Sequence, residues 1–139
     1  MSASWQMPLD DSLRIVESQH QEIFDLSDSF LTAIARAEDA AVLAGMVRTL
    51  TTFLRLHIDV EENLMKRAGY PHFEEHRPHH VSLLEKIGAI AEKNERGDGV
   101  GDEVRHLIES FVLHHDHVDC KFMTFIRAVP AARALAPVA

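Results

Sequence analysis

Two pairs of polar side chains stand four residues apart in this sequence, and both are of types that bind metal ions. His57 and Glu61 form the first pair, and His76 and His80 form the second. In an α-helix, residues four apart lie about 40° from each other on one face. Each pair can therefore reach one metal ion or bridge two, since imidazole nitrogens and carboxylate oxygens are common ligands of iron and zinc.

Both pairs replace apolar residues on stripes that should face a hydrophobic core. Apolar residues recur at Leu43, Val47, Leu50 and Leu54, and the same helical face continues through His57 and on to Glu61 and Leu64. Burying polar groups without partners costs free energy. Four such groups on core-facing positions therefore need a common partner.

Two further helical runs add His20, His114 and Asp119 to inward positions. His114 and Asp119 are five residues apart, which is about 140° around an α-helix, so their side chains must converge from different angles. The combined set suits a pair of iron ions, because a lone zinc ion needs only four ligands and calcium or magnesium prefers oxygen throughout. The candidate ligands are five imidazoles and two carboxylates: His20, His57, Glu61, His76, His80, His114 and Asp119.

The elements that must position these residues are amphipathic helices. Asp39 is the expected N-cap of the run that carries His57, and Gly69 is its expected C-terminal stop. Ser18 with Gln21 has the pattern of a capping box at the start of an earlier helix. The predicted helices cover about residues 18–37, 40–68, 74–96 and 102–128, with a leader over about residues 1–16 and a tail over residues 130–139.

Four helices of these lengths with short connections predict an all-α fold, an antiparallel up-down-up-down four-helix bundle with an extended N-terminal leader. No segment has the pattern of a strand, and no internal repeat is evident. The 139 residues are the size of one ordinary domain. We therefore expect a single domain over residues 1–139.

Composition narrows the classes of partner. Lys and Arg total 14 against 22 Asp and Glu, and the formal charge of -8 argues against nucleic acid or an anionic membrane. The sequence contains no run of twenty apolar residues and no signal peptide pattern. Its single cysteine, Cys120, cannot form an internal disulfide and fits a reducing compartment. We expect a monomeric cytoplasmic protein that binds a small molecule.

In this order and spacing, the candidate ligands resemble those of the hemerythrin family, and closely those of its single-domain bacterial members. The resemblance spans about residues 5–127. Its further markers are Trp5, Gln19, Phe24, the segment Glu62-Asn-Leu-Met65, Tyr70-Pro71 and Lys121-Phe122.

The resemblance implies a non-haem di-iron centre with two iron ions per chain. One iron would take His76, His80 and His114, the other would take His20 and His57, and Glu61, Asp119 and an oxo or hydroxo oxygen would bridge them. The second iron then has one open position, where dioxygen binds reversibly and where nitric oxide or azide could also enter.

The implied function is dioxygen binding for carriage, storage or sensing. The histidine-rich ligand set agrees with a binding protein that is not an enzyme, because ferritin-like di-iron sites use four carboxylates and two histidines. One alternative is a di-iron enzyme that consumes dioxygen, peroxide or nitric oxide. Another is an iron-storage protein or a protein that repairs iron centres.

The expected dioxygen pocket comprises Ser110, Phe111 and His115. Two of these depart from the family resemblance, because many relatives have an apolar residue at position 115 and an aromatic residue at position 110. A more polar pocket would favour autoxidation or admit small anions. The alternative is that His115 points sideways between helices.

For several other polar or reactive residues the sequence predicts no part in the metal centre. Glu62 faces about 100° away from Glu61, which predicts a solvated side chain. Cys120 is predicted to be an inert small side chain. The remaining histidines fall off the inward stripes and are expected at the surface: His72, His79, His106 and His117.

Overall fold

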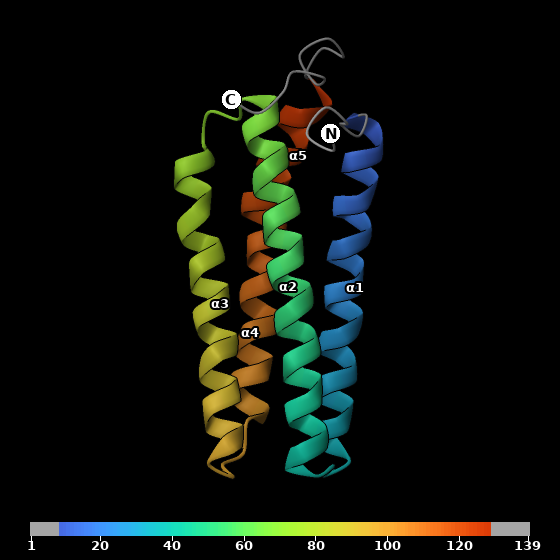
Figure 1. Cartoon of the computed structure of the whole chain (residues 1–139), viewed down its shortest axis with the longest axis vertical. Helices are drawn as coiled ribbons and strands as arrows, with labels where there is room; N and C mark the ends of the chain where they lie inside the picture. Colours follow the sequence, from blue (N-terminus) through green and yellow to red (C-terminus); the bar gives the residue numbers. More distant parts are fainter. Residues whose placement is uncertain (1–8, 129–139) are drawn as a thin grey trace, which may run out of the picture.

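The computed structural model describes residues 9–128 of the chain, and it confirms the all-α four-helix bundle. We call each of the four long helical segments of the bundle a rod. The fourth rod is continuous, but it consists of an α-helix, a π-helical segment and a second α-helix. Figure 1 shows that neighbouring rods run in opposite directions. The elements are α1 (Leu9–Ala35), α2 (Ala40–Ala68), α3 (Phe73–Glu95), α4 (Gly101–Leu113), the π-helical segment η2 (His114–Asp119) and α5 (Cys120–Arg127).

The bounds of α2 match the prediction, and its ends show why. Gly69 follows the helix in the left-handed conformation with φ of 68°, and its N–H bonds to the carbonyl of Lys66. Glycine adopts this conformation without the penalty that a Cβ atom brings. Asp39 occupies the predicted N-cap position, although its side chain makes no capping hydrogen bond.

The predicted start of the first helix near residue 18 is wrong. The helix α1 begins at Leu9, so Ser18 and Gln21 lie inside it and do not cap it. The reason is that the inward stripe continues upstream: Val16 is fully buried and packs in a cluster with Leu64. The remaining part of the predicted leader, residues 1–8, and the predicted tail, residues 130–139, lie outside the described residues.

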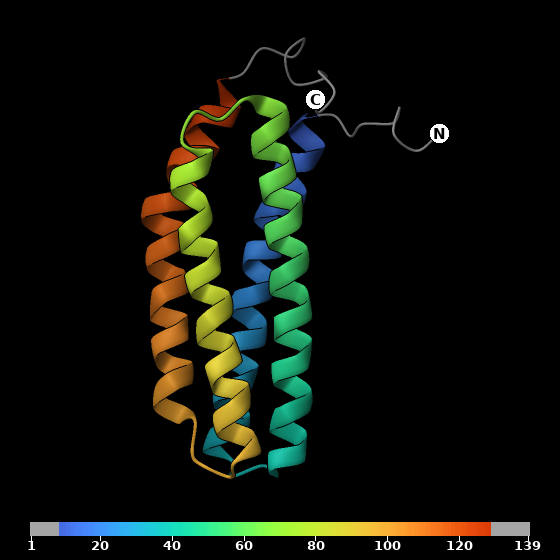
Figure 2. The same ribbon diagram turned by 60° about the vertical axis from the view of Figure 1, so that its left-hand side comes forward.

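Two apolar clusters fill the bundle at different heights, and a polar layer separates them. Figure 2 shows the helices that carry them running side by side along the long axis of the bundle. Along α2 the larger cluster ends at Ile58, the smaller begins at Leu64, and Glu61 lies between them. All four helices of the bundle contribute buried residues to the larger cluster, whereas α3 adds only the partly buried Phe73 to the smaller one, so packed side chains lie on both sides of the polar layer.

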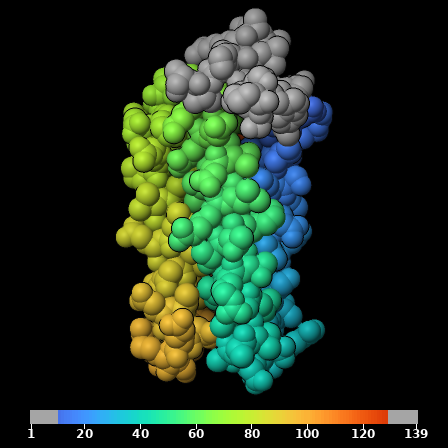
Figure 3. Space-filling view, viewed as in Figure 1, coloured from blue at the N-terminus to red at the C-terminus, as the bar shows by residue number. Residues whose placement is uncertain are grey.

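Helix α2 runs along one face of the molecule (Figure 3), and two of its large apolar side chains are exposed to solvent. Val42 and Leu56 are 44% and 52% exposed on it. By length and composition alone, α2 is the helix of residues 9–128 that could cross a membrane. Core helices of soluble bundles often pass the same test, and the inward stripe of α2 is fully occupied by core contacts.

The larger apolar cluster should carry much of the stability of the metal-free protein. Phe30 is 1% exposed in this cluster. We expect Phe30→Ala to lower the free energy of unfolding by about 3–5 kcal/mol, because it removes buried contacts and leaves a cavity. Urea denaturation of the metal-free protein measures this change. Val42→Ala is the control at an exposed site, where a loss as large as that of Phe30→Ala would contradict this account of the core.

Candidate metal centre

The structure brings all seven candidate ligands together in the polar layer. Each is between 0% and 5% exposed. They form two overlapping groups in which the possible ligand atoms lie within 4.8 Å of one another. Glu61 and Asp119 belong to both groups. The first group adds His76, His80 and His114 to these carboxylates, and the second adds His20 and His57.

Glu61 turns one carboxylate oxygen toward each group. Its Oε1 lies 3.0 Å from His80 Nε2 and 3.2 Å from His76 Nε2. Its Oε2 lies 3.3 Å from His20 Nε2 and 3.5 Å from His57 Nε2. The carboxylate is therefore oriented to bridge two metal positions.

Asp119 divides its oxygens in the same way. Its Oδ1 lies 2.9 Å from His76 Nε2 and 2.8 Å from His114 Nε2, whereas its Oδ2 lies 3.0 Å from His20 Nε2. Two carboxylates thus face the same two groups of imidazoles from α2 and from η2.

Most of these short contacts are not aligned as hydrogen bonds. The Nε2 atoms of His20, His57, His76 and His114 and both oxygens of Asp119 are buried and have no hydrogen-bond partner among the described residues. Buried polar atoms in proteins are normally satisfied. Cations shared between the imidazoles and carboxylates would satisfy all of these atoms at once, so the donor set fits a metal centre.

The segment η2 explains how His114 and Asp119 share the inward face. The N–H of Cys120 bonds to the carbonyl of His115, five residues back, which is the hydrogen bond of a π-helix. This wider turn brings residues five apart close to alignment, whereas an α-helix would separate them by about 140°. The sequence predicted that the two side chains converge, but it did not predict the π-helical turn that brings them together.

Two residues outside the ligand set orient the imidazoles. The Oε1 atom of Gln19 lies 2.9 Å from Nδ1 of His57, and Oε2 of Glu62 lies 2.7 Å from Nδ1 of His80. Acceptors of this kind fix the ring and increase its basicity as a ligand. The prediction that Glu62 is solvated is therefore wrong, because its side chain reaches from α2 across to α3 and is only 22% exposed.

Opposite charges face each other in the metal-free centre. Burial opposes ionisation of Glu61 and Asp119, but short contacts with the imidazoles outweigh it and hold both pKa values below their usual range. Burial lowers the pKa values of His20 and His76, yet contacts with the two carboxylates raise each to about 9. Burial lowers the pKa of His114. At pH 7 two carboxylates therefore face two imidazolium groups.

Metal binding must displace these protons, because a metal-bound imidazole uses the same nitrogen. At pH 7 we expect about two protons to be released per chain, from His20 and His76, whose pKa values lie near 9. Metal affinity should rise with pH and level off above about pH 9. Calorimetric titration of the metal-free protein in buffers of different ionisation enthalpy counts the protons. Affinity that increases as the pH falls would contradict this description of the centre.

The contact between Glu62 and His80 makes a second testable prediction. Substituting Glu62→Ala should weaken metal binding about 10- to 100-fold, because His80 loses the acceptor of its Nδ1 proton. Competition with a chelator measures the affinity. Asp59→Ala, on an exposed position of the same helix, is the control. Equal affinities for the two variants would show that Glu62 does not support the metal ligand.

The three residues predicted to form a dioxygen pocket do not lie together. The ring of His115 packs edge-on against that of His20 at 4.7 Å, and both line a cleft of about 520 Å³ together with Phe24. Phe111 is buried behind this cleft, 4.9 Å from the ring of Phe24. Ser110, however, lines a different cleft between α3 and α4. Its predicted place in the pocket is wrong, because it projects from the other side of the helix.

The remaining histidines are exposed, as predicted, and Cys120 is also exposed, at the rim of the cleft that leads to His20. In that rim Arg127 donates a hydrogen bond to Glu17 at 2.9 Å, which links α5 to α1.

A four-helix bundle with a buried, histidine-rich and carboxylate-linked metal centre defines a class of metal-binding bundle proteins. The chain belongs to the hemerythrin family: the profile of the hemerythrin HHE cation binding domain matches residues 11–126. The resemblance found in the sequence is thereby confirmed.

Relatives named bacteriohemerythrin agree with this membership. The protein of Pseudomonas aeruginosa is 26% identical over 111 residues, covering 80% of this chain and 72% of its own. That of Stenotrophomonas maltophilia is 23% identical over the same shares. That of Campylobacter jejuni is 24% identical over 102 residues, covering 73% of this chain and 77% of its own. No solved structure matched the chain significantly.

Proposed function

We propose that the centre binds two iron ions and holds dioxygen reversibly, for carriage, storage or sensing. One observation carries the proposal: Glu61 and Asp119 each divide their oxygens between a group with three histidines and a group with two. Two metal positions with unequal numbers of protein ligands follow. The position with fewer ligands, beside His20 and His57, has room for an added small molecule.

The surroundings of this position support the proposal. The cleft of about 520 Å³ reaches His20, so a small molecule has a route to the position that lacks a ligand. Phe24 and Phe111 flank His20 on the apolar side, and His115 covers it on the outer side. The cleft is also lined by the exposed charged side chains of Glu17, Asp116 and Arg127, whereas aromatic rings surround His20 itself, where a small uncharged molecule such as dioxygen fits.

Two ferrous ions, when bound, supply the electrons that dioxygen takes up and returns on release. The residues of this chain keep both ions in place through the exchange. Glu61 and Asp119 would each contribute an oxygen to both ions, and Gln19 and Glu62 hold the rings of His57 and His80 in orientation. Burial of the ligands keeps bulk water away from the centre.

The optical spectrum tests this function directly. The anaerobic ferrous protein should be nearly colourless, turn pink-violet in air and bleach again on degassing. Elemental analysis should find two irons per chain. Irreversible yellowing in air would instead indicate an enzyme that consumes dioxygen, and one zinc at full occupancy after growth in iron-rich medium would contradict the iron centre.

The shared carboxylate provides a matched pair of variants. Glu61→Ala should lose both irons, because its two oxygens face both groups of imidazoles. Glu85→Ala, on an exposed position of α3, should keep them. Iron content after purification measures the difference, and retention of one iron by Glu61→Ala would argue against a bridging role.

His115 favours a second candidate function, the consumption of dioxygen, peroxide or nitric oxide. This polar side chain is 40% exposed and lies against His20, so it can admit water and protons to the centre. Substituting His115→Ile should slow oxidation to the ferric form several-fold, since it makes the approach more apolar. The decay of the oxygenated spectrum measures the rate, with exposed His106→Ile as the control. An unchanged rate would show that His115 does not influence the oxidation of the centre.

A further inference from the structure

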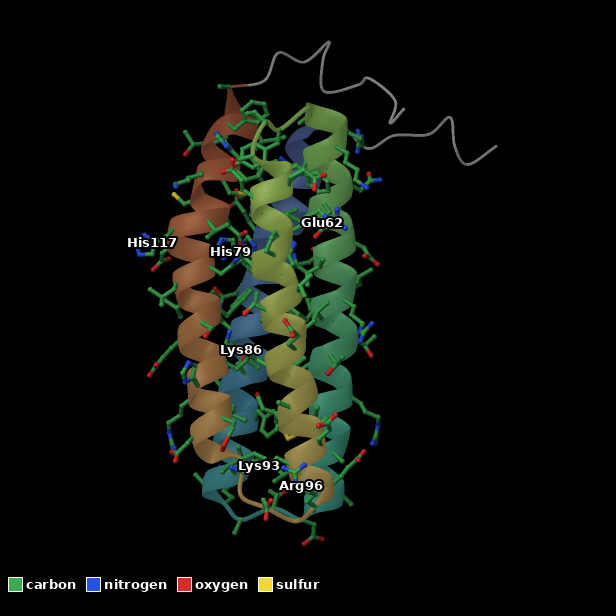
Figure 4. All side chains as sticks on the ribbon, turned by 90° about the vertical axis from the view of Figure 1, so that its left-hand side faces the viewer. Glu62, His79, Lys86, Lys93, Arg96 and His117 are labelled. Carbon is green, nitrogen blue, oxygen red and sulfur yellow. The ribbon has the colours of Figure 1, made fainter. Side chains whose placement is uncertain are left out.

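A second cleft reaches the metal centre from another side, between α3 and the junction of α4 with η2. Its volume is about 390 Å³. Figure 4 shows His79 and Lys86 on α3 and His117 on η2 at this side of the bundle. The polar residues that line the cleft are His79, Ser82, Lys86, Ser110, His114 and His117.

The innermost of these residues has an unsatisfied ring nitrogen. His114 is 5% exposed, and its Nε2 lies 2.8 Å from Asp119 Oδ1 in the centre. Its other nitrogen, Nδ1, is buried and has no hydrogen-bond partner in the described part of the chain. When a metal occupies Nε2, Nδ1 carries the proton and becomes a donor. A group that enters the cleft can accept this hydrogen bond.

His114 differs in this respect from two other imidazoles of the centre, and although Nδ1 of His76 also has no partner among the described residues, His76 does not line this cleft. His57 has Gln19 and His80 has Glu62 as partners for Nδ1. Metal-bound histidines almost always donate this second proton to a carboxylate, a carbonyl or water. The acceptor for His114 must therefore come from outside the described residues.

The lining of the cleft determines what kind of acceptor fits. Lys86 donates to Ser82 Oγ at 2.7 Å and has two further ammonium protons free to donate. The ring of His79 lies 5.9 Å from that of His114. Within residues 9–128 no carboxylate lines this cleft. The rest of the lining is apolar, from Leu83, Leu113 and Val118, so the Lys86 ammonium has no negative side chain to face in this cleft within residues 9–128, which favours an anion with several oxygen acceptors.

We propose that this cleft binds a small oxyanion of the phosphate or carboxylate class, which pairs with Lys86 and accepts the Nδ1 proton of His114. The anion would make the His114 ring a stronger metal ligand, so anion and metal would strengthen each other's binding. The proposal requires a metal at the centre but not dioxygen binding. It is therefore testable in the zinc-loaded protein, in which dioxygen chemistry plays no part.

Titration of the zinc-loaded full chain with inorganic phosphate tests the site. We expect the ¹H–¹⁵N resonance of His114 Nδ1 to shift and saturate, and chloride at equal ionic strength to leave it unchanged. Acetate in a parallel titration separates carboxylate from phosphate as the preferred class. A shift confined to His20 and His57 would place the anion at the metals and overturn the proposal. Failure of the chain to load zinc would contradict both the metal centre and this site.

Two lysines on α3 form a matched pair of variants. Lys86→Gln should weaken phosphate binding roughly tenfold. Lys93→Gln should leave it unchanged, because Lys93 pairs with Glu103 at 2.9 Å farther along the same helix (Figure 4). Ser110→Ala, which removes a hydroxyl group from the cleft, should weaken binding by a smaller factor. If Lys86→Gln and Lys93→Gln weakened phosphate binding equally, phosphate would be responding to the overall positive charge. That result would contradict the proposed site.

Discussion

The structure depends on the burial of two carboxylates, Glu61 and Asp119, which have no measurable exposure to solvent. Taking an ionised carboxylate out of water is costly unless other charges or donors compensate it. Five imidazoles from four rods of the bundle provide that compensation, and protons or metal ions complete it. The four helices must therefore place these side chains at the same level of the bundle and turn them inward. The apolar clusters on the two sides of this level keep the helices in that arrangement.

The predicted features followed from strong local patterns. The bounds of α2 were predicted because an apolar stripe ends at Gly69, where a left-handed residue is needed. The start of α1 was missed because Ser18 and Gln21 imitate a helix cap inside a longer stripe. All seven ligands were predicted to lie inward, since each replaces an apolar residue of a stripe. The role of Glu62 was not foreseen, because spacing along one helix does not reveal a contact with the next helix.

The centre is reached from two sides whose chemistry differs. The cleft at His20 combines the ring of Phe24 with charges of both signs, from Glu17, Asp116 and Arg127. The cleft at His114 contains Lys86 and, within residues 9–128, no carboxylate, so it suits an anion. The position of Ser110 illustrates why the sequence could not separate them: one residue along a helix turns a side chain by about 100°, which is enough to change the side on which it lies.

The π-helical segment also changes the periodicity of inward-facing residues along the fourth rod. The inward positions before it are Val104, Leu107 and Phe111, and those after it are Phe122 and Ile126. These two stripes are out of phase by one residue, so a continuous α-helical periodicity over the whole rod cannot describe both. The wider turn of the π-helical segment takes up one residue more than an α-helical turn, so Phe122 and Ile126 still face inward. A helical-wheel projection of this rod should therefore be drawn separately for the residues before His114 and for those after Asp119.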